Sequence, residues 1–208
     1  MIDAQPHPLL DAWILEARLP AALAEVSSPD PLLVALAEGP PQTDEALKTA
    51  VRGLLRHGGF KPSGRNKPAS EYLLKAAEGG FLKPINAVVD ICNVVSRDHG
   101  LPISVVDLDR TDGALHIQVV QAGSYLFNAS GQELKLDGLL CLHDQSGPCA
   151  NAVKDSQRTK THDGTRRVLA VIWGSHEVPG LAERTCLAYA DWLGRLGAEV
   201  RSGPALPR

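Results

Sequence analysis

The pattern of apolar and polar positions changes near residue 100. Before that point, Leu- and Ala-rich segments begin near capping residues and close on glycines, which is typical of helices. After it, short β-branched runs bounded by turn residues indicate strands. We expect helices over residues 7–26, 27–39, 43–59, 69–78 and 84–100, strands over most of 103–174, and a last helix over 180–200.

This order of elements predicts an α+β fold, because helices followed by strands do not form alternating βαβ units. We expect N-terminal helices, one central buried helix, layered and mostly antiparallel β-sheets, and a C-terminal helix. The 208 residues suffice for one sizeable domain. Within it we assign residues 1–58 to an N-terminal helical part, 59–200 to an α+β core and 201–208 to a tail. In the second helix, Ser28 and Asp30 are placed to cap the first turn.

The predicted helix over 84–100 carries a narrow polar stripe. Asn86, Asp90, Asn93 and Arg97 are spaced by four, three and four residues, which keeps them on one helical face. Apolar residues cover most of the remaining circumference, so we expect this helix to be central. The stripe either meets solvent through a slit or lines a pocket, because buried polar groups need partners.

Composition excludes some functions. A net charge of -3 argues against a protein that coats nucleic acid, and 4% aromatic residues argue against base stacking as the main activity. The charges are unevenly placed, however. Residues 1–47 hold eight acids and one base, residues 48–83 hold eight bases and two acids, and a second basic stretch spans 154–167. Each basic stretch either follows a phosphate backbone or forms a solvated face.

No apolar run is long enough for a membrane span, and the acidic N-terminus lacks the features of a signal peptide. We therefore expect a cytoplasmic protein with no membrane partner. The four cysteines form no CxxC pair, which favours reduced, buried thiols. Cys141, His143 and Cys149 are the only weak candidates for a metal site, and we expect neither a metal nor a cofactor.

The segment KPINAVVDICNVVSRDHGLPISVVDLDRTDG, residues 83–113, resembles the start of the editing module in the bacterial phenylalanyl-tRNA synthetase beta subunit. A Pro-Ile-Asn, a Val-Val-Asp, an Asn and a Pro followed by Asp-Leu-Asp recur at the same spacings. From about Gly59 to Trp173 the chain is similar to free-standing proteins of this tRNA-binding, editing-domain family, and the first 50 residues resemble only those free-standing members. The resemblance implies an α+β fold, a pocket beside the central helix, and hydrolysis in trans of the ester that joins a wrong amino acid to tRNA.

Three positions depart from the synthetase pattern. Ser104 stands where the synthetase module has a histidine, Cys92 where it has a threonine, and Ala170 where its pocket glutamate is expected. These departures leave open whether catalysis is abolished or redirected. The free-standing members include a deacylase of canavanyl-tRNA(Arg), and the chain resembles that class more than the synthetase. A pocket discriminates poorly between arginine and its oxygen-containing mimic, so a second sieve is useful. Asp90 or Asp107 suits a guanidinium-like side chain.

An aminoacyl ester is already activated, so a deacylase has to place a water, hold the terminal adenosine and stabilise the oxyanion. We predict three groups of site residues from the stripe, the following strand and the basic stretches. The catalytic candidates are Asn93, Asp90, Ser104 and Thr159; the substrate-binding candidates are Asn86, Asp107 and Arg158; the tRNA-binding candidates are Arg65, Lys67, Lys154, Lys160 and Arg166.

Each of these residues also has an ordinary structural role open to it. Asp107 is suited to capping a turn, Thr159 to a strand and Arg158 to a solvated surface. We therefore keep two alternatives to the deacylase: a non-catalytic tRNA-binding module, and a small-molecule hydrolase that uses Cys or Ser with His. Cys92 is a poor nucleophile, because an apolar helix interior raises a thiol's pKa. The expected partner is tRNA, with an aminoacyl-tRNA synthetase as a second candidate and no DNA.

Overall fold

The apolar run near the end of the chain forms strand β9 (Arg167–Ser175), which is buried on both faces. The computed structural model describes residues 2–38 and 44–207. Along β9, Ala170 and Ile172 belong to the core that is shared with the helices. Leu169 and Val171 belong to the core that is shared with a second sheet. Burial on both faces explains why this strand reads as a continuous apolar run.

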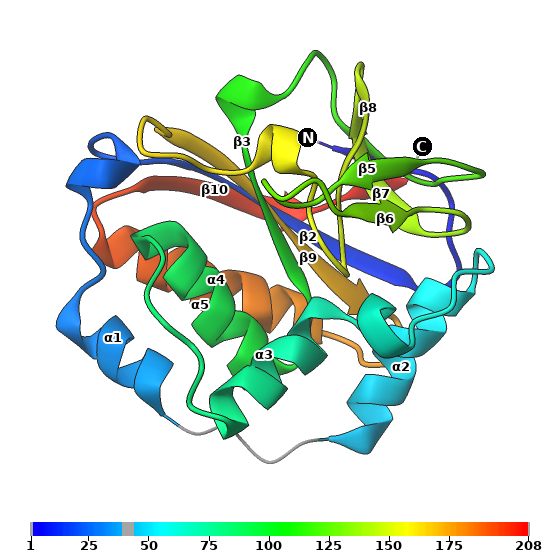
Figure 1. Ribbon diagram of the computed structural model, residues 1–208, viewed down its shortest axis with the longest axis horizontal. Helices are drawn as coiled ribbons and strands as arrows, with labels where there is room; N and C mark the ends of the chain where they lie inside the picture. Colours follow the sequence, from blue (N-terminus) through cyan, green and yellow to red (C-terminus); the bar gives the residue numbers. More distant parts are fainter. Residues whose placement is uncertain (1, 39–43, 208) are drawn as a thin grey trace.

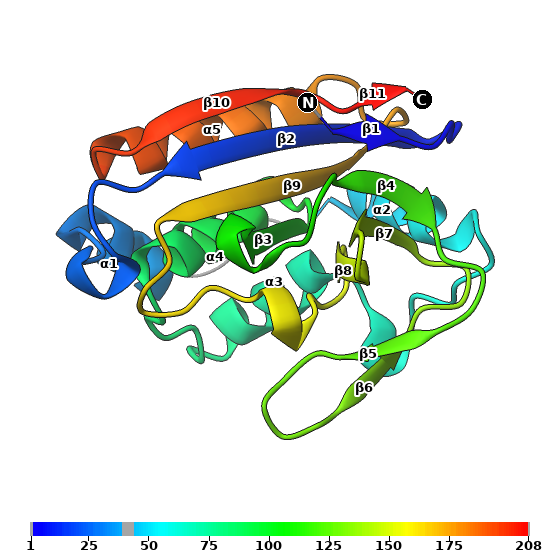
Figure 2. The same ribbon diagram turned by 90° about the horizontal axis from the view of Figure 1, so that it is seen from above.

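A four-stranded antiparallel sheet is built around β9, with the order β10-β2-β9-β3. Its other members are β10 (Glu199–Pro204), β2 (Leu10–Arg18) and β3 (Ile103–Asp107). β2 pairs with β9 over nine residues, and Figure 2 shows the long strands β10, β2 and β9 side by side. β3 is therefore an edge strand, and one of its edges is free to meet other parts of the fold.

A second sheet has five strands in the order β11-β1-β4-β7-β8. They are β1 (Asp3–Ala4), β4 (His116–Val119), β7 (Leu140–Asp144), β8 (Gly147–Asn151) and β11 (Leu206–Pro207). β1 runs parallel to both of its neighbours, and the remaining pairs are antiparallel. Strands β5 (Ser124–Leu126) and β6 (Glu133–Lys135) form a separate two-stranded arm that extends from the domain (Figure 2).

The helices lie beneath the four-stranded sheet in the view of Figure 1. They are α1 (Asp30–Ala37), α2 (Glu45–Arg56), α3 (Ala69–Glu78), α4 (Ala87–His99) and α5 (Leu181–Arg195). α4 contacts α1, α3, α5 and β3, so the expected central helix and the α+β fold are confirmed. Asn86 caps its N-terminus, and Gly100, with φ of 72°, ends it in the left-handed conformation that favours glycine.

Two parts of the predicted helix pattern were wrong. We expected a helix over 7–26, but residues Leu10–Arg18 form β2, because pairing with β9 and β10 on both edges outweighs the helix propensity of Leu and Ala. We also expected the last helix to reach residue 200. It ends at Arg195, and the following segment forms β10, which continues into the predicted tail.

The predicted cap of the second helix was also wrong. Pro29 occupies the N-cap position of α1 and makes no side-chain cap, while Ser28 bonds elsewhere. The predicted ends at residues 39 and 43 lie outside the described residues. The boundaries at 58 and 200 stay a prediction. Within the described ranges, no helix has both the length and the apolar character needed to cross a membrane.

Candidate functional site

The stripe on α4 divides into residues that hold the fold together and one that reaches a pocket. Asp90 is fully buried, and its carboxylate accepts a 2.5 Å hydrogen bond from the Ser28 hydroxyl and a 2.8 Å bond from the Ile85 amide. Arg97 is 2% exposed and donates to the carbonyls of Ala35 and Glu38. Both side chains thus fasten the α1 segment to α4, and neither lines the pocket described next.

Asn86 and Asn93 lie on the same face of the helix but have different roles. The Asn86 side chain accepts a 3.0 Å hydrogen bond from the Val89 amide and so caps the helix. Asn93, about two helical turns further along, is half-buried and lines a pocket of about 790 Å³. Of the four stripe residues, Asn93 alone is among those that line this pocket.

The pocket lies between α3, α4, the start of β3 and the β5–β6 arm. Its wall includes polar, charged and aromatic side chains that are distant in sequence. Among them are Arg65, Asn66, Tyr72, Cys92, Asn93, Ile103, Phe127, Glu133, Val153 and Lys154. A volume of this size is in the range that holds small-molecule or nucleotide-sized ligands.

Lys154 gives the pocket a positive wall. Its ammonium group donates a 3.0 Å hydrogen bond to the carbonyl of Arg65 and lies 4.3 Å from the centre of the Phe127 ring and 5.9 Å from that of Tyr72. Burial and the nearby Arg65 charge lower the pKa of Lys154. No aromatic platform can be recognised in the sequence, because Tyr72 and Phe127 are far apart along the chain and only the fold brings them to one pocket.

Asp155 is an acid that the sequence analysis missed. It follows Val153 and Lys154, and its two carboxylate oxygens accept 3.2 Å hydrogen bonds from the backbone amides of Val105 and Asn151. Burial raises the pKa of Asp155 to about 6, although the Ser104 hydroxyl and the two amides oppose that shift. Its sequence position inside a basic stretch offered no signal of this environment.

Ser104 and Asp107 are buried in structural networks away from the pocket. The Ser104 hydroxyl donates to the carbonyl of Asn151 (3.0 Å) and accepts from the indole of Trp173 (2.9 Å). The Asp107 carboxylate accepts from the Thr165 hydroxyl at 2.5 Å and lies 3.2 Å from the ring nitrogen of His162. Neither side chain lines the pocket, because Ser104 points to the opposite face of β3 and Asp107 ends that strand.

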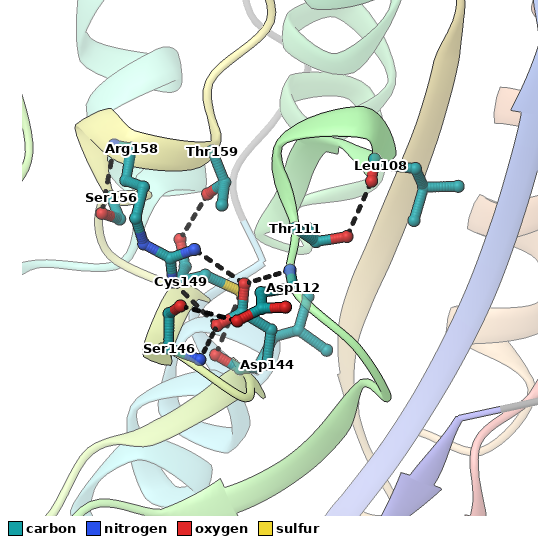
Figure 3. Close-up of polar contacts among 10 residues, drawn as sticks. Leu108, Thr111, Asp112, Asp144, Ser146, Cys149, Ser156, Arg158 and Thr159 are labelled. Carbon is teal, nitrogen blue, oxygen red and sulfur yellow. Dashed lines mark hydrogen bonds and ion pairs between the residues drawn. The ribbon is translucent and has the colours of Figure 1, made fainter.

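Arg158 and Thr159 form part of another polar cluster, shown in Figure 3. They belong to the short helix η4 (Gln157–Thr159), which follows β8. The Arg158 guanidinium donates two hydrogen bonds, 2.7 and 2.9 Å long, to the buried carboxylate of Asp144. Burial opposes ionisation of Asp144, but the bonds from Arg158 and nearby amides hold its pKa below the usual value. Thr159 donates to the carbonyl of Cys149 at 3.1 Å. Both residues therefore anchor η4.

The predicted tRNA-binding residues fall into two places. Arg65 and Lys154 line the pocket, and Lys67 directly follows the short helix η2 (Gly64–Asn66) that carries Arg65. Lys160 is half-buried and donates a 2.5 Å bond to the Phe127 carbonyl at the end of the β5–β6 arm. Arg166 is exposed and lies 4.0 Å from Glu25, away from this group.

The four cysteines and Ser104 are not placed to act as nucleophiles. All four cysteines are buried, and desolvation raises the pKa of each thiol, that of Cys149 to about 12. Ser104 is bonded to a carbonyl and an indole rather than to a histidine. In the ranges 2–38 and 44–207, no three His, Cys, Asp or Glu side chains converge as metal ligands.

The fold and the pocket define an α+β domain with a polar pocket between a central helix and a sheet edge. Residues 61–180, more than half of the chain, match the B3/4 domain, and the chain belongs to this family. Every pocket-lining residue falls within the matched range.

The matched region is also similar to several phenylalanine–tRNA ligase beta subunits. The chain is 29% identical over 118 residues to the subunit of Bartonella henselae, covering 55% of this chain and 15% of the relative. It is 32% identical over 85 residues to that of Brucella abortus, covering 40% and 11%. It is 29% identical over 121 residues to that of Thiobacillus denitrificans, covering 56% and 16%. The chain therefore spans only a small part of the length of these curated relatives.

Proposed function

We propose that this chain is an aminoacyl-tRNA deacylase that acts in trans, hydrolysing the ester between a wrong amino acid and tRNA. The observation that carries the proposal is the coincidence of two features. The B3/4 match covers the whole pocket, and the amide of Asn93 lines the same pocket as the cationic groups of Arg65 and Lys154. An amide suits the ester or the terminal ribose, and the cations suit the phosphates of a tRNA end.

The proposed reaction requires few specialised groups. The ester is activated, so the site must orient it, admit one water and stabilise the developing oxyanion. Tyr72 and Phe127 line the same pocket and present flat apolar surfaces on which a terminal base can stack. We propose a cytoplasmic protein for which tRNA is the partner, and we add an aminoacyl-tRNA synthetase as a second proposed partner because mischarged tRNA leaves that enzyme.

We propose canavanyl-tRNA(Arg) as the substrate. The acid that we propose to bind its guanidinium-like side chain is now Glu133 in place of Asp90 or Asp107. Asp90 and Asp107 are committed to other contacts, whereas Glu133 lines the pocket and is exposed. A carboxylate at this position suits the guanidinium-like group of canavanine. The assignment predicts that Glu133→Gln weakens discrimination between cationic and neutral amino acids.

The test is incubation of the purified protein with a panel of mischarged tRNAs, including canavanyl-tRNA(Arg), while release of the amino acid is followed over time. Correctly charged arginyl-tRNA(Arg) is the matched control. We expect canavanyl-tRNA(Arg) to lose its amino acid at least about tenfold faster than in buffer, which corresponds to roughly 1.4 kcal/mol of barrier lowering. Unchanged ester half-lives across the whole panel would contradict the proposal.

A non-catalytic tRNA-binding module is the second candidate, and a specific observation favours it. Six of the seven side chains predicted to act in catalysis or substrate binding lie outside the pocket lining, and Asn93 is the exception. Retention of tRNA by the protein, together with esters that decay at the buffer rate, would favour this module over the deacylase.

A further inference from the structure

We propose that Phe81 is a stacking surface for an unpaired nucleotide of the tRNA 3′ end, one that precedes the terminal adenosine held in the pocket. The inference rests on the proposed function through its tRNA partner and deepens it, because it names the path by which the nucleic acid reaches the pocket. It comes from the place of one exposed aromatic ring on the face of α3 that carries the pocket.

Phe81 is an exposed residue whose backbone is held in place. It belongs to the loop of residues 79–86 that joins α3 to α4 (Figure 1). Its exposed fraction is 75%, the highest among the large apolar residues that are exposed in the described part of the chain. Its amide donates a 2.8 Å hydrogen bond to the carbonyl of Ala76 in the last turn of α3. This bond fixes where the ring leaves the main chain.

Gly79 makes room for the Phe81 ring. The φ of Gly79 is -87°, so its backbone conformation does not require a glycine. A side-chain carbon at this position would lie 2.4 Å from the nearest ring carbon of Phe81. The absence of a side chain therefore lets the ring lie against the C-terminal end of α3.

The Phe81 ring lies on the same face of α3 as the pocket. Ala69 and Tyr72 are among the residues that line the pocket. At 100° per residue, Ala76 falls within the arc between these two side chains, and Gly79 falls about 20° from Tyr72. Seven residues of helix rise about 10 Å, so the ring lies roughly that far along α3 from Tyr72. About three stacked nucleotides span such a distance, at about 3.4 Å each.

The charges around this path suit a phosphate backbone. Lys75 of α3 and Lys83 of the loop are both exposed. Glu71 is paired with Arg52 through two 2.6 Å hydrogen bonds, and Glu78 lies on the side of α3 opposite the pocket face. The path therefore continues the positive wall of the pocket toward the end of the helix.

An aromatic ring flanked by lysines matches the chemistry of single-stranded nucleic acid. Proteins that bind single strands combine cations along the backbone with rings on which bases stack, and such stacking tolerates any base. The phenylalanine ring carries no polar group that would read base identity. A ring outside the pocket can thus hold a base that precedes the terminal adenosine while the ester lies inside.

The experiment measures the binding of two labelled RNAs by fluorescence anisotropy. One is an uncharged tRNA with its complete 3′ end, and the other is the same tRNA trimmed back to its paired acceptor stem. Phe81→Ala should weaken binding of the complete tRNA at least about fivefold, the lower end for loss of one base–aromatic stack. It should change binding of the trimmed tRNA less than about twofold. Melting curves should match those of wild type, because the side chain is exposed.

Two further variants separate stacking from general apolar contact. Phe81→Tyr keeps the ring and should bind the complete tRNA as wild type does. Phe81→Leu keeps an apolar side chain without an aromatic face and should lose most of the affinity that Phe81→Ala loses. Leu187→Ala is the matched control, a change at an apolar residue of α5 that is 55% exposed, and it should leave both affinities unchanged.

A Phe81→Ala affinity within about twofold of wild type for the complete tRNA, or an equal loss for both RNAs, would overturn the assignment. So would a wild type that self-associates in sedimentation experiments while Phe81→Ala stays monomeric and keeps its tRNA affinity, because the ring would then join copies of the chain. Neither RNA carries an ester, so the outcome does not depend on catalysis. Affinity that depends on Phe81 without any deacylation would support this inference and contradict the deacylase.

Discussion

The hydroxyl of Ser28 donates a 2.5 Å hydrogen bond to the carboxylate of Asp90, a residue 62 positions later in the chain. The contact joins the segment before α1 to the first turns of α4. Asp90 has no exposed surface, and its second oxygen is occupied by the Ile85 amide. The carboxylate that the sequence suggested for catalysis therefore serves the fold, and this changes what its substitution should do.

We predict that Asp90→Asn lowers the stability of the protein and leaves the intrinsic deacylation rate of the folded fraction unchanged. A carboxamide has one accepting oxygen in place of two, so one of the two hydrogen bonds to this buried side chain is lost, at a cost of about 1–3 kcal/mol. Denaturant titration measures the free energy of unfolding, and single-turnover kinetics measure the deacylation rate of the folded protein. A folded variant with normal stability and a greatly slowed rate would return Asp90 to the reaction site.

Ser28→Ala is the matched control for this contact, because it removes only the donor. The two single variants and the double variant form a double-mutant cycle. We expect an interaction free energy above roughly 0.5 kcal/mol, since the two side chains share one hydrogen bond. If the two single changes in the free energy of unfolding simply added up in the double variant, the hydrogen bond would contribute nothing to stability.

We predict the opposite behaviour for Asn93→Ala. Asn93 lines the pocket, so its loss should slow single-turnover deacylation by roughly 10- to 100-fold, the scale of one lost hydrogen bond to the reacting group, with little change in melting temperature. Asn86→Ala on the same helix is the control. It removes the cap on the Val89 amide and should cost about 1 kcal/mol of stability without slowing the folded enzyme. Equal effects of both variants on the rate would contradict this division of roles.

We predict that tRNA affinity falls steeply with salt and that the pocket cations carry part of this dependence. If Arg65 and Lys154 each contact a phosphate, Arg65→Gln and Lys154→Gln should each reduce the slope of log affinity against log salt by roughly 0.7 to 0.9. Fluorescence anisotropy with labelled, uncharged tRNA measures these slopes.

Arg201→Gln is the control for the salt experiment. Arg201 is an exposed residue on β10, and β10 and β3 form opposite edges of the four-stranded sheet. For Arg201→Gln, the slope of log affinity against log salt should match that of wild type. Slopes that are flat for every protein, or reduced equally by Arg201→Gln, would place the tRNA contact elsewhere.

We predict that acid destabilises the protein partly through His143. Burial first, and the neighbouring His116 second, lower the pKa of His143 from 6.5 to about 4. The folded state therefore binds this proton less readily than the unfolded chain. The resulting stability is present above about pH 6.5 and is lost as the pH falls toward 4, amounting to roughly 2 kcal/mol between pH 7.5 and 5.

The comparison with His143→Gln isolates this effect. Asp155 acts in the other direction, because its raised pKa makes the folded state bind a proton more readily as the pH falls toward 6 and below. That contribution is common to both proteins. Denaturant unfolding at several pH values should therefore show a smaller loss of stability in acid for His143→Gln. If the free energy of unfolding changed with pH in the same way for wild type and His143→Gln, the pKa of His143 would not be lowered in the folded state.

Local sequence signals were sufficient for several elements. Gly100 predicted the end of α4, because a helix end is set by residues within one turn, and the broad apolar arc predicted its central place; the predicted start at residue 84 lies three residues before the observed start at Ala87. The β-branched runs likewise predicted β3 and β9. The segment Leu10–Arg18 could not be recognised as β2 in the same way, because its partners are β9 and β10, more than 140 residues away. A strand's ladder depends on those distant neighbours, whereas a helix bonds within itself.

The sequence by itself determined the family likeness and the α+β class, and it offered Asn93 as one of seven candidates for catalysis or substrate binding. Only the tertiary structure decided which polar side chains remain available in the pocket. Asp90, Ser104, Asp107, Arg158 and Thr159 carry the residue types that a site needs, but each is bonded to a group from elsewhere in the fold. Asp155 looked like one more charge in a basic stretch until β3 supplied it with the Val105 amide and burial. Residue type states what a side chain can bond to, and the distant segments packed around it decide what it does bond to.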